Sequence, residues 1–384
     1  MVNNKKLYEI LELLRVRINN LFAISLFVCL KQFYRKRNNR SNNILFINTG
    51  LMGDLIISTV ILKNDANLKK VFSTVYLLFD KRYAELFKDF DSQIKILFVD
   101  LNKYRLNLFY RVSFLNKLQK LNLETSINIS FSRRTLDDEI TLLNGSHFCL
   151  GFDNAPKIPK LFSNYIDSNY TKIIKPFTGN HHIDILNLLE EIGVNSPFRD
   201  TIEFQLNNIP SELTSIFNIT RRVVSLAPLT SNSIKNWNSK NYVELANQII
   251  KNFNVVIVIL GDKLGHYFLK QNNSQIIDLS GRTTLEEAAS IISISDLFIG
   301  NDSGLFHLAK ANKIPRIGII GGGAVNIVFP YGICEKEILL FKEMNCFGCH
   351  WKCIYDQAHC LQEITVANVL DSVKLILEDE KIGQ

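Results

Sequence analysis

The segment 296–311 narrows the choice of fold more than any other part of the chain. An apolar strand is predicted over 296–300, a turn of small and polar residues over 301–304, and a helix over 305–311. The first amide groups of such a helix have no partners within it and, together with the helix dipole, they favour a bound anion. Because Gly304 has no Cβ, a ligand could approach the backbone closely there. A strand that ends in this way is typical of an α/β sheet that binds its ligand at the strand ends.

Strands and helices alternate along two halves of the chain, the pattern expected of parallel sheets with helices on both faces. In the first half, strands are predicted over 43–48, 75–79, 94–99 and 126–129, and helices over 54–62, 104–120 and 182–192. In the second half, strands are predicted over 223–226, 255–260, 296–299 and 316–320, and helices over 242–250 and after the capping box that Thr284 opens. A chain of 384 residues is long enough for about two such domains.

The predicted fold class is therefore α/β, with two Rossmann-like, doubly wound domains and an additional N-terminal helical arm. We assign the basic amphipathic arm to 1–41, the N-terminal domain to 42–205, a linker to 206–220, the C-terminal domain to 221–363 and a final helix to 364–384. Two doubly wound sheets joined by one linker place a cleft between their strand ends, where open α/β sheets bind ligands.

The net charge of +7 belongs almost entirely to the arm. Nine of the 44 lysines and arginines, but only two of the 37 acidic residues, fall within 1–40, so the rest of the chain carries 35 residues of each sign. A nucleic-acid-binding domain is expected to be strongly basic over one face. The neutral body therefore argues against nucleic acid as a partner.

The arm contains an apolar run over 21–30. Ten residues are too few to span a bilayer as a helix, and basic residues follow the run in place of a signal-peptide cleavage site. Two interpretations stay open: an interfacial helix attracted to anionic lipid, or a helix packed on the body. We expect a cytoplasmic protein, and the first interpretation adds peripheral contact with the inner face of the cytoplasmic membrane through residues 1–40.

A first candidate site lies in the turn after the first predicted strand. Gly50 and Gly53 let the chain turn tightly, and Asp54 follows at the predicted helix start. A carboxylate there could take a proton from an acceptor hydroxyl group. Aspartate is also among the best N-cap residues, and the local sequence by itself favours that alternative. A nicotinamide site is a weaker alternative, because the Gly-x-Gly-x-x-Gly fingerprint is absent.

A second polar loop, 227–237, follows a strand in the other half. The hydroxyl groups of Thr230, Ser231 and Ser233 and the ammonium group of Lys235 suit a phosphate. Lys235 would neutralise the charge that develops as a phosphate group leaves. The local alternative, which this loop by itself favours, is a polar surface loop with Trp237 packed beneath it.

The third candidate loop is the turn before Gly304. Asp302 could cap the helix, and Ser303 could hold a phosphate oxygen. By itself, His307 in the first helical turn is more typical of a packed histidine than of a ligand contact. The glycines at 321–323 offer either another open stretch of backbone or a flexible connector.

Four of the seven cysteines cluster late in the chain, at Cys346, Cys349, Cys353 and Cys360. Four thiolates at this spacing could hold structural zinc, form a redox-sensitive pair, or stay reduced. We identify no carboxylate pair in the candidate loops that suits a catalytic divalent ion. We therefore expect neither a catalytic metal nor a cofactor.

With these residues taken together, the chain resembles glycosyltransferase family 9, the heptosyltransferase-like enzymes of lipopolysaccharide assembly. The resemblance covers about 43–378 and is strongest from Leu279 to Ala289 and from Gly300 to Ala309. The Met52-Gly53-Asp54 turn and the Lys235-Asn236-Trp237 loop also match, in the same order as in the family.

The resemblance implies a GT-B architecture, in which the two domains face a central cleft and the last helix crosses back to the first domain. It implies an inverting, metal-independent transfer of a sugar, typically from ADP-heptose, to a lipid-linked or lipopolysaccharide core saccharide. Asp54 would be the general base, and Lys235 would stabilise the departing diphosphate. A non-catalytic carbohydrate-binding protein and a sugar-nucleotide epimerase of similar fold are the alternatives.

The site residues that the resemblance implies fall into two groups. The donor-binding residues would be Thr230, Ser231, Lys235, Asp262, Asn301, Asp302, Ser303, Gly304 and His307, and the acceptor-side loop would contain Gly50, Met52 and Gly53.

Overall fold

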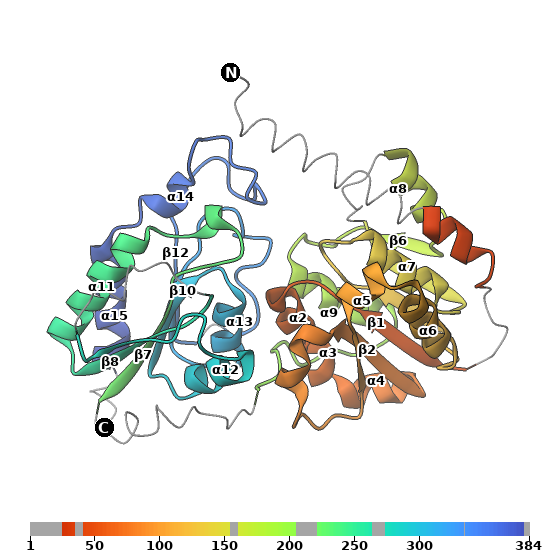
Figure 1. Cartoon of the computed structure of the whole chain (residues 1–384), viewed down its shortest axis with the longest axis horizontal. Coiled ribbons are helices and arrows are strands. Elements are labelled where there is room, and N and C mark those ends of the chain that lie inside the picture. The colour runs from red at the N-terminus through yellow and green to blue at the C-terminus, as the bar shows by residue number, and fades with distance from the viewer. Residues whose placement is uncertain are drawn as a thin grey trace.

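A computed structural model of the chain describes residues 25–34, 41–153, 160–204, 221–262, 273–333 and 335–379. Two α/β domains lie side by side, the first coloured red to yellow-green and the second green to blue (Figure 1). The predicted linker 206–220 and most of the arm lie outside the described residues. Within the described part, no helix combines the length and the apolarity needed to cross a membrane.

The N-terminal domain is built on a parallel sheet of six strands in the order β3-β2-β1-β4-β5-β6. Its strands are β1 (Asn43–Ile47), β2 (Thr74–Asp80), β3 (Lys95–Val99), β4 (Thr125–Asn128), β5 (Phe148–Phe152) and β6 (Lys172–Ile174). Its helices are α2 (Met52–Ser58), α3 (Val60–Lys63), α4 (Asp65–Val71), the 3₁₀ helix η1 (Lys81–Phe87), α5 (Leu101–Leu106), α6 (Leu108–Gln119), α7 (Thr135–Leu143), α8 (Lys160–Asp167) and α9 (His181–Glu191).

The C-terminal domain repeats this plan with a parallel sheet in the order β12-β11-β10-β7-β8-β9. Its strands are β7 (Arg222–Ala227), β8 (Val255–Ile259), β9 (Ile276–Asp278), β10 (Leu297–Asn301), β11 (Arg316–Ile319) and β12 (Glu337–Leu340). Its helices are the 3₁₀ helix η2 (Ser233–Lys235), α11 (Ser239–Asn252), α12 (Leu285–Ser293), α13 (Gly304–Ala311), α14 (His359–Gln362) and α15 (Val366–Asp379).

The predicted fold class is confirmed, and the strand orders explain where the sites lie. In each sheet the order reverses beside the first strand of the domain: β1 pairs with both β2 and β4, and β7 pairs with both β8 and β10. A crevice opens at such a switch point, outside the carboxyl ends of the strands. The loops after β1, β7 and β10, which the sequence singled out, all leave from these positions.

Two predicted helices have different bounds in the structure. The helix predicted over 54–62 begins at Met52 and is divided at Thr59 into α2 and α3. The stretch 104–120 forms two helices, because the Asn107 side chain caps a new helix by accepting a hydrogen bond from the amide of Tyr110. The capping box at Thr284 is confirmed, since the side chains of Thr284 and Glu287 each accept a hydrogen bond from the other's amide.

The final helix does not follow the prediction that it crosses back to the first domain. Its apolar side chains, including Val369, Val373 and Leu377, belong to the core of the C-terminal domain. There α15 packs against α11, and Arg222 at the start of β7 donates a hydrogen bond to the carbonyl of Leu377. The helix stays on its own domain, at the left of Figure 1, because its apolar stripe is already buried there.

The two domains meet where α2 crosses α13. A Cβ on Gly304 would lie 2.0 Å from Cε and 2.8 Å from Cβ of Met52, and a Cβ on Gly53 would lie 2.7 Å from the His307 ring. The absent side chain at Gly304 therefore makes room for Met52, and not for a ligand as the sequence suggested. Each glycine lets a side chain of the other domain pack against its backbone.

This contact leads to a first testable expectation. Gly304→Ala should destabilise the protein by about 1–3 kcal/mol, because the added methyl group would overlap Met52 in a packed interface. Alanine is the better helix former, so helix propensity would act in the opposite direction. Urea unfolding measures the effect, and the double variant with Met52→Ala should recover most of the loss. An unchanged midpoint for the single variant would contradict this account of the interface.

Candidate active site

Asp54 comes from the loop between β1 and α2, which Asn48 holds in place. The Asn48 side chain accepts a hydrogen bond from the Gly50 amide at 3.0 Å and donates one to the Asp54 carbonyl at 2.9 Å. Leu51 is the N-cap of α2, and one Asp54 carboxylate oxygen accepts a hydrogen bond from the Leu51 amide at 3.3 Å. Asp54 is thus the third residue of the helix and not its N-cap, which corrects the local alternative.

The Asp54 carboxyl lies at the boundary between the two domains. Its side chain is 21% exposed, so it is neither turned into the interior nor fully in solvent. Burial raises the pKa of this carboxyl, although the Leu51 amide and the positive charge of Lys235 oppose the rise. A carboxylate that has a raised pKa and is still accessible to a substrate is suited to accept a proton.

His181 lies beside Asp54 and was missed by the sequence analysis. Its Nδ1 is 3.9 Å from an Asp54 carboxylate oxygen, and its ring stacks on Phe131 with 3.8 Å between ring centroids. Burial, and next the nearby His350, lower the pKa of His181 to about 3, so the imidazole is neutral at pH 7. No local motif marks this histidine, because its position depends on the packing of α9 against α2.

Lys235 and Asp302 form the other side of the site, in the C-terminal domain. The Lys235 ammonium lies 2.6 Å from an Asp302 carboxylate oxygen and 5.3 Å from the centre of the Trp351 ring. Burial alone would raise the pKa of Asp302, but the hydrogen bond with His307 and the charge of Lys235 outweigh it and hold the value at about 2. Asp302 is therefore an anion that fixes the position of Lys235.

His307 links this ion pair to the first domain. It is buried, its Nε2 lies 3.5 Å from Asp302, and its Nδ1 lies 2.7 Å from the hydroxyl of Tyr331. The ring also stacks on Phe329 and covers Gly53. The structure thus places His307 as a packed histidine that positions Asp302, whereas the predicted donor contact would need an exposed ring.

The remaining residues of the 301–304 turn hold the loops in place. Ser303, and not Asp302, caps α13, since its Oγ accepts a hydrogen bond from the Phe306 amide. Asn301 is buried and joins β10 to the loop after β7: it donates to the Pro228 carbonyl at 2.6 Å and accepts from the Trp237 amide at 3.2 Å. Trp237 is packed beneath that loop, as the local alternative predicted.

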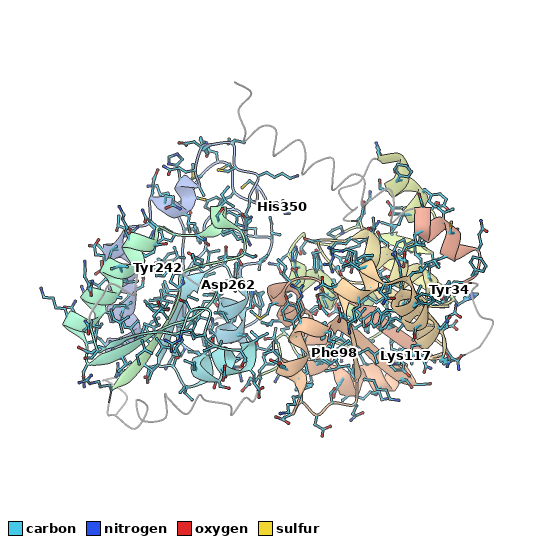
Figure 2. All side chains as sticks on the ribbon, in the orientation of Figure 1. Tyr34, Phe98, Lys117, Tyr242, Asp262 and His350 are labelled. Carbon is cyan, nitrogen blue, oxygen red and sulfur yellow. The ribbon has the colours of Figure 1, made fainter. Side chains whose placement is uncertain are left out.

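Three other predicted donor contacts lie around this loop. The Thr230 hydroxyl donates to the Asn232 carbonyl at 2.7 Å, and the Thr230 amide donates to the Asn236 side chain at 2.8 Å. Ser231 is exposed on the same loop. Asp262, labelled in Figure 2, is exposed just after β8, and the residues that follow it lie outside the described part.

Aromatic side chains from the cysteine-rich segment cover the glycines at 321–323. A Cβ on Gly322 would lie 2.2 Å from the Phe347 ring, and a Cβ on Gly323 would lie 2.6 Å from Trp351. This backbone is therefore neither open to a ligand nor a free connector. The glycines let Trp351 reach a position beneath Lys235.

The four clustered cysteines lie near one another, since charge on Cys346, Cys349 or Cys353 acts on Cys360. Among the described residues, no group of three or more histidine, cysteine or acidic side chains has an arrangement that could hold a metal ion. Cys360 is buried, and burial raises the pKa of its thiol. The Cys353 thiol donates to the Gln357 carbonyl at 3.4 Å. The described geometry gives no support to the zinc interpretation.

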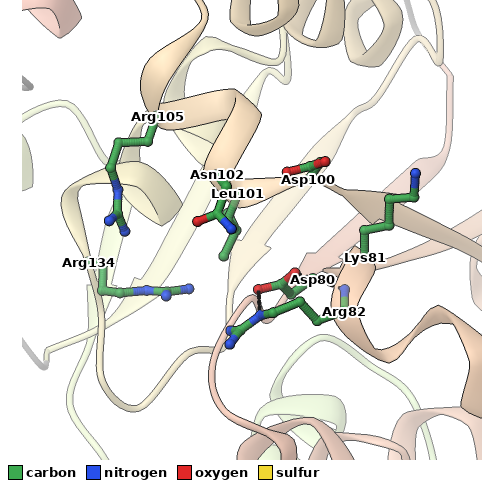
Figure 3. A pocket seen from close by; sticks show the side chains of 8 residues that line it. All are labelled: Asp80, Lys81, Arg82, Asp100, Leu101, Asn102, Arg105 and Arg134. Atoms are coloured by element: carbon green, nitrogen blue, oxygen red, sulfur yellow. Dashed lines mark hydrogen bonds and ion pairs between the residues drawn. The ribbon is translucent and has the colours of Figure 1, made fainter. Parts of the chain in front are cut away.

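Two hollows adjoin the Asp54 loop. One, of about 300 Å³, lies between the domains and is lined by residues that include His181, Asn326 and His350. The other, of about 390 Å³, lies on the N-terminal domain and is lined by Asp80, Lys81, Arg82, Asp100, Leu101, Asn102, Arg105 and Arg134 (Figure 3). We call it the basic pocket, and the sequence analysis did not find it.

The basic pocket connects directly to the Asp54 loop. Arg134, at the start of α7, donates hydrogen bonds to the carbonyl and hydroxyl of Thr49, one residue before Gly50. Arg82 pairs with Asp80 at 2.8 Å, and a dashed line marks that pair in Figure 3. The four cations of the pocket outnumber its two acids, so it favours an anionic group.

Comparison with known proteins decides the family. The model of glycosyltransferase family 9 (heptosyltransferase) matches residues 145–354, which is more than half of the chain. The chain belongs to glycosyltransferase family 9. The lipooligosaccharide heptosyltransferase 2 of Campylobacter jejuni is 24% identical over 170 residues, which are 42% of this chain and 53% of that protein. The chain thus spans about half the length of the curated relatives it matches.

Solved structures of family members share the fold. A glycosyl transferase family 9 protein from Veillonella parvula has a TM-score of 0.70 at 15% identity and covers 90% of this chain and 100% of its own. The Escherichia coli heptosyltransferase WaaC with ADP-2-deoxy-2-fluoro heptose has a TM-score of 0.61 at 16% identity, covering 86% of this chain and 99% of its own. These likenesses establish the GT-B arrangement of two Rossmann-like domains.

Proposed function

We propose that this family 9 protein is an inverting glycosyltransferase that moves a heptose from ADP-heptose to a lipid-linked or lipopolysaccharide core saccharide. The observation that carries the proposal is that Asp54 lies close enough to the Lys235–Asp302 pair, across the domain boundary, for both charges to act on its pKa. One acid on the acceptor side and one cation on the donor side are what a displacement at a sugar carbon requires. The names of the curated relatives and the ligand of the WaaC structure support heptose and ADP as the first donor to test.

In the proposed reaction Asp54 accepts the proton of the acceptor hydroxyl. The acceptor oxygen attacks the anomeric carbon on the face opposite the diphosphate, and the bond from that carbon to the diphosphate oxygen breaks. The bonding electrons leave with ADP, whose added negative charge faces Lys235 and the first amides of α13. Attack from the opposite face inverts the configuration of the sugar carbon.

The residues around Asp54 and Lys235 support these roles. The neutral His181 adds no positive charge beside Asp54, so the carboxylate is not tied in a permanent ion pair. Asp302 and Trp351 hold the Lys235 ammonium on two sides.

The basic pocket suits an acceptor saccharide that carries phosphate or carboxylate groups. We place such an enzyme at the inner face of the cytoplasmic membrane, where the arm 1–40 would contact anionic lipid.

A donor panel tests the proposal. In a thermal-shift experiment, ADP and ADP-heptose should raise the melting temperature, because they bind the folded state only, whereas UDP, GDP and their sugars should not. With a core saccharide acceptor, ADP release should continue unchanged in excess EDTA, since Asp54 and Lys235 need no divalent ion. Stabilisation by another nucleotide alone would overturn the donor assignment. Loss of turnover in EDTA, with the fold intact, would overturn the metal-independent mechanism.

A further inference from the structure

The corner between α5 and α6 exposes an unusual amount of apolar surface. Leu106 is 83% exposed, Leu108 is 53% exposed and Phe109 is 89% exposed, and these residues lie within four consecutive positions. Single exposed apolar residues are common on soluble domains, but a contiguous patch marks an interaction surface. Within the described residues, each of these three side chains is more than half exposed.

This patch is separate from the apolar face through which α6 packs on the N-terminal domain. The inner face of α6 is buried through Phe114, Leu115 and Leu118. Arg111 on the same face forms a buried ion pair with Glu139. Because α6 already packs on the domain through these residues, its core packing does not need Phe109.

The surroundings of the patch are basic. Lys103, Arg105, Lys117 and Lys120 are exposed on α5, on α6 and just after it. The sequence has no acidic residue between Asp100 and Glu124. A cationic surface with apolar side chains at its centre is complementary to a bilayer that contains anionic lipid.

The N-terminal arm joins the domain at the same helix. Phe27, in the helix 25–31, is buried and contacts the ring of Tyr165 in α8, and the Tyr34 hydroxyl donates to the Val112 carbonyl of α6 at 3.2 Å. Tyr34 and Lys117 both lie on the side of the N-terminal domain that faces away from the second domain (Figure 2). The next residues in the sequence are the basic run 35–37. The arm thus adds positive charge to the chain directly after the residue that contacts α6.

We propose that Leu106, Leu108 and Phe109 insert into the interface of an anionic bilayer, while Lys103, Arg105, Lys117 and Lys120 contact the lipid headgroups. We call these seven residues the docking corner. Arg105 also lines the basic pocket, so a bilayer at the corner would lie next to that pocket. This use of the corner, to present a membrane-anchored acceptor, rests on the proposed function, but the docking itself requires no sugar transfer.

Vesicle co-sedimentation of the full chain tests the docking. Phosphatidylcholine vesicles with and without phosphatidylglycerol are the probe, and the triple variant Leu106→Ser/Leu108→Ser/Phe109→Ser removes the apolar patch. Its partition onto the anionic vesicles should fall about tenfold or more, given the transfer free energy of three exposed apolar side chains. Lys117→Glu/Lys120→Glu should reduce the difference between anionic and neutral vesicles.

A matched control comes from the C-terminal domain. Ile354 is 77% exposed and Leu375 is 61% exposed, far from the corner in sequence, and Ile354→Ser/Leu375→Ser should bind vesicles as the wild type does. Equal binding of the triple variant and the wild type would overturn the proposal. Any binding to vesicles would then be assigned to the N-terminal arm. A change from oligomer to monomer in light scattering without vesicles would also overturn it, since a second copy would then be the partner. Stabilisation by ADP, measured on the same variants, reports on the proposed function separately.

Discussion

Replacing Asp54 by asparagine should lower turnover by about 10²- to 10⁴-fold, the range that general-base catalysis usually supplies. ADP binding should stay intact. The amide keeps the shape of the side chain, and its oxygen can still accept the hydrogen bond from Leu51 that the carboxylate accepts. It cannot take a proton from the acceptor. The measurement is the rate of ADP release with saturating donor and acceptor, beside calorimetric titration with ADP.

The pH profile provides an independent test of the same residue. Only the carboxylate form accepts a proton, so activity should rise with pH through the pKa of Asp54. Burial raises this pKa, and the acid limb of kcat/KM should therefore lie above the value of about 4 for a free aspartate. The limb should vanish in the asparagine variant. Asp371→Asn, on the exposed face of α15, is the control and should change neither rate nor profile. Wild-type turnover in Asp54→Asn would remove this residue from the mechanism.

Replacing Lys235 by methionine should lower kcat/KM by about 10²- to 10³-fold, the usual loss when one group that stabilises developing charge is removed. Methionine keeps much of the apolar stem over Trp351 but cannot face the departing diphosphate. Lys240→Met is the matched control, because Lys240 is exposed in the first turn of the helix that follows the same loop. Steady-state kinetics with varied donor concentration measure the effect.

A double variant separates two roles of Lys235. If its only task were to neutralise the buried Asp302, then Asp302→Asn would restore activity to the Lys235→Met protein. If Lys235 also contacts the diphosphate, the double variant should remain as slow as Lys235→Met, although its stability should recover because no unpaired carboxylate is left buried. Restored activity would assign Lys235 to a structural role.

The amino-acid sequence predicted much of the fold, because local patterns carry that information. Short apolar runs such as 43–48 and 255–260 marked buried strands, and the residues at Thr284 and Glu287 marked a helix start that the structure confirms. The ends of the helices were predicted less accurately. Asn107 divides a stretch that reads as one helix, and Leu51 occupies the N-cap position that the sequence suggested for Asp54.

The site was predicted only in part, for reasons that lie in the packing. The loops that contain Asp54, Lys235 and Asp302 were found because each follows a predicted strand, and the structure places those strands at switch points. His181 and the basic pocket were missed, since no motif near either reports which elements will pack beside them. The same limit explains why the backbone at Gly304 and at 321–323 is not open to a ligand as expected. Side chains from other segments, namely Met52, Phe347 and Trp351, pack against these glycines.

The sequence by itself determined the two parallel sheets, the loops at their strand ends and the family, since hydrophobic periodicity and short motifs are local properties of the chain. Only the tertiary structure decided which polar groups meet. It paired Lys235 with Asp302, buried His307 against Tyr331, placed His181 beside Asp54, and kept α15 on its own domain. Those contacts join residues tens to hundreds of positions apart, and they form because burying the apolar faces of α2, α9, α13 and α15 leaves one arrangement for the polar side chains at their edges.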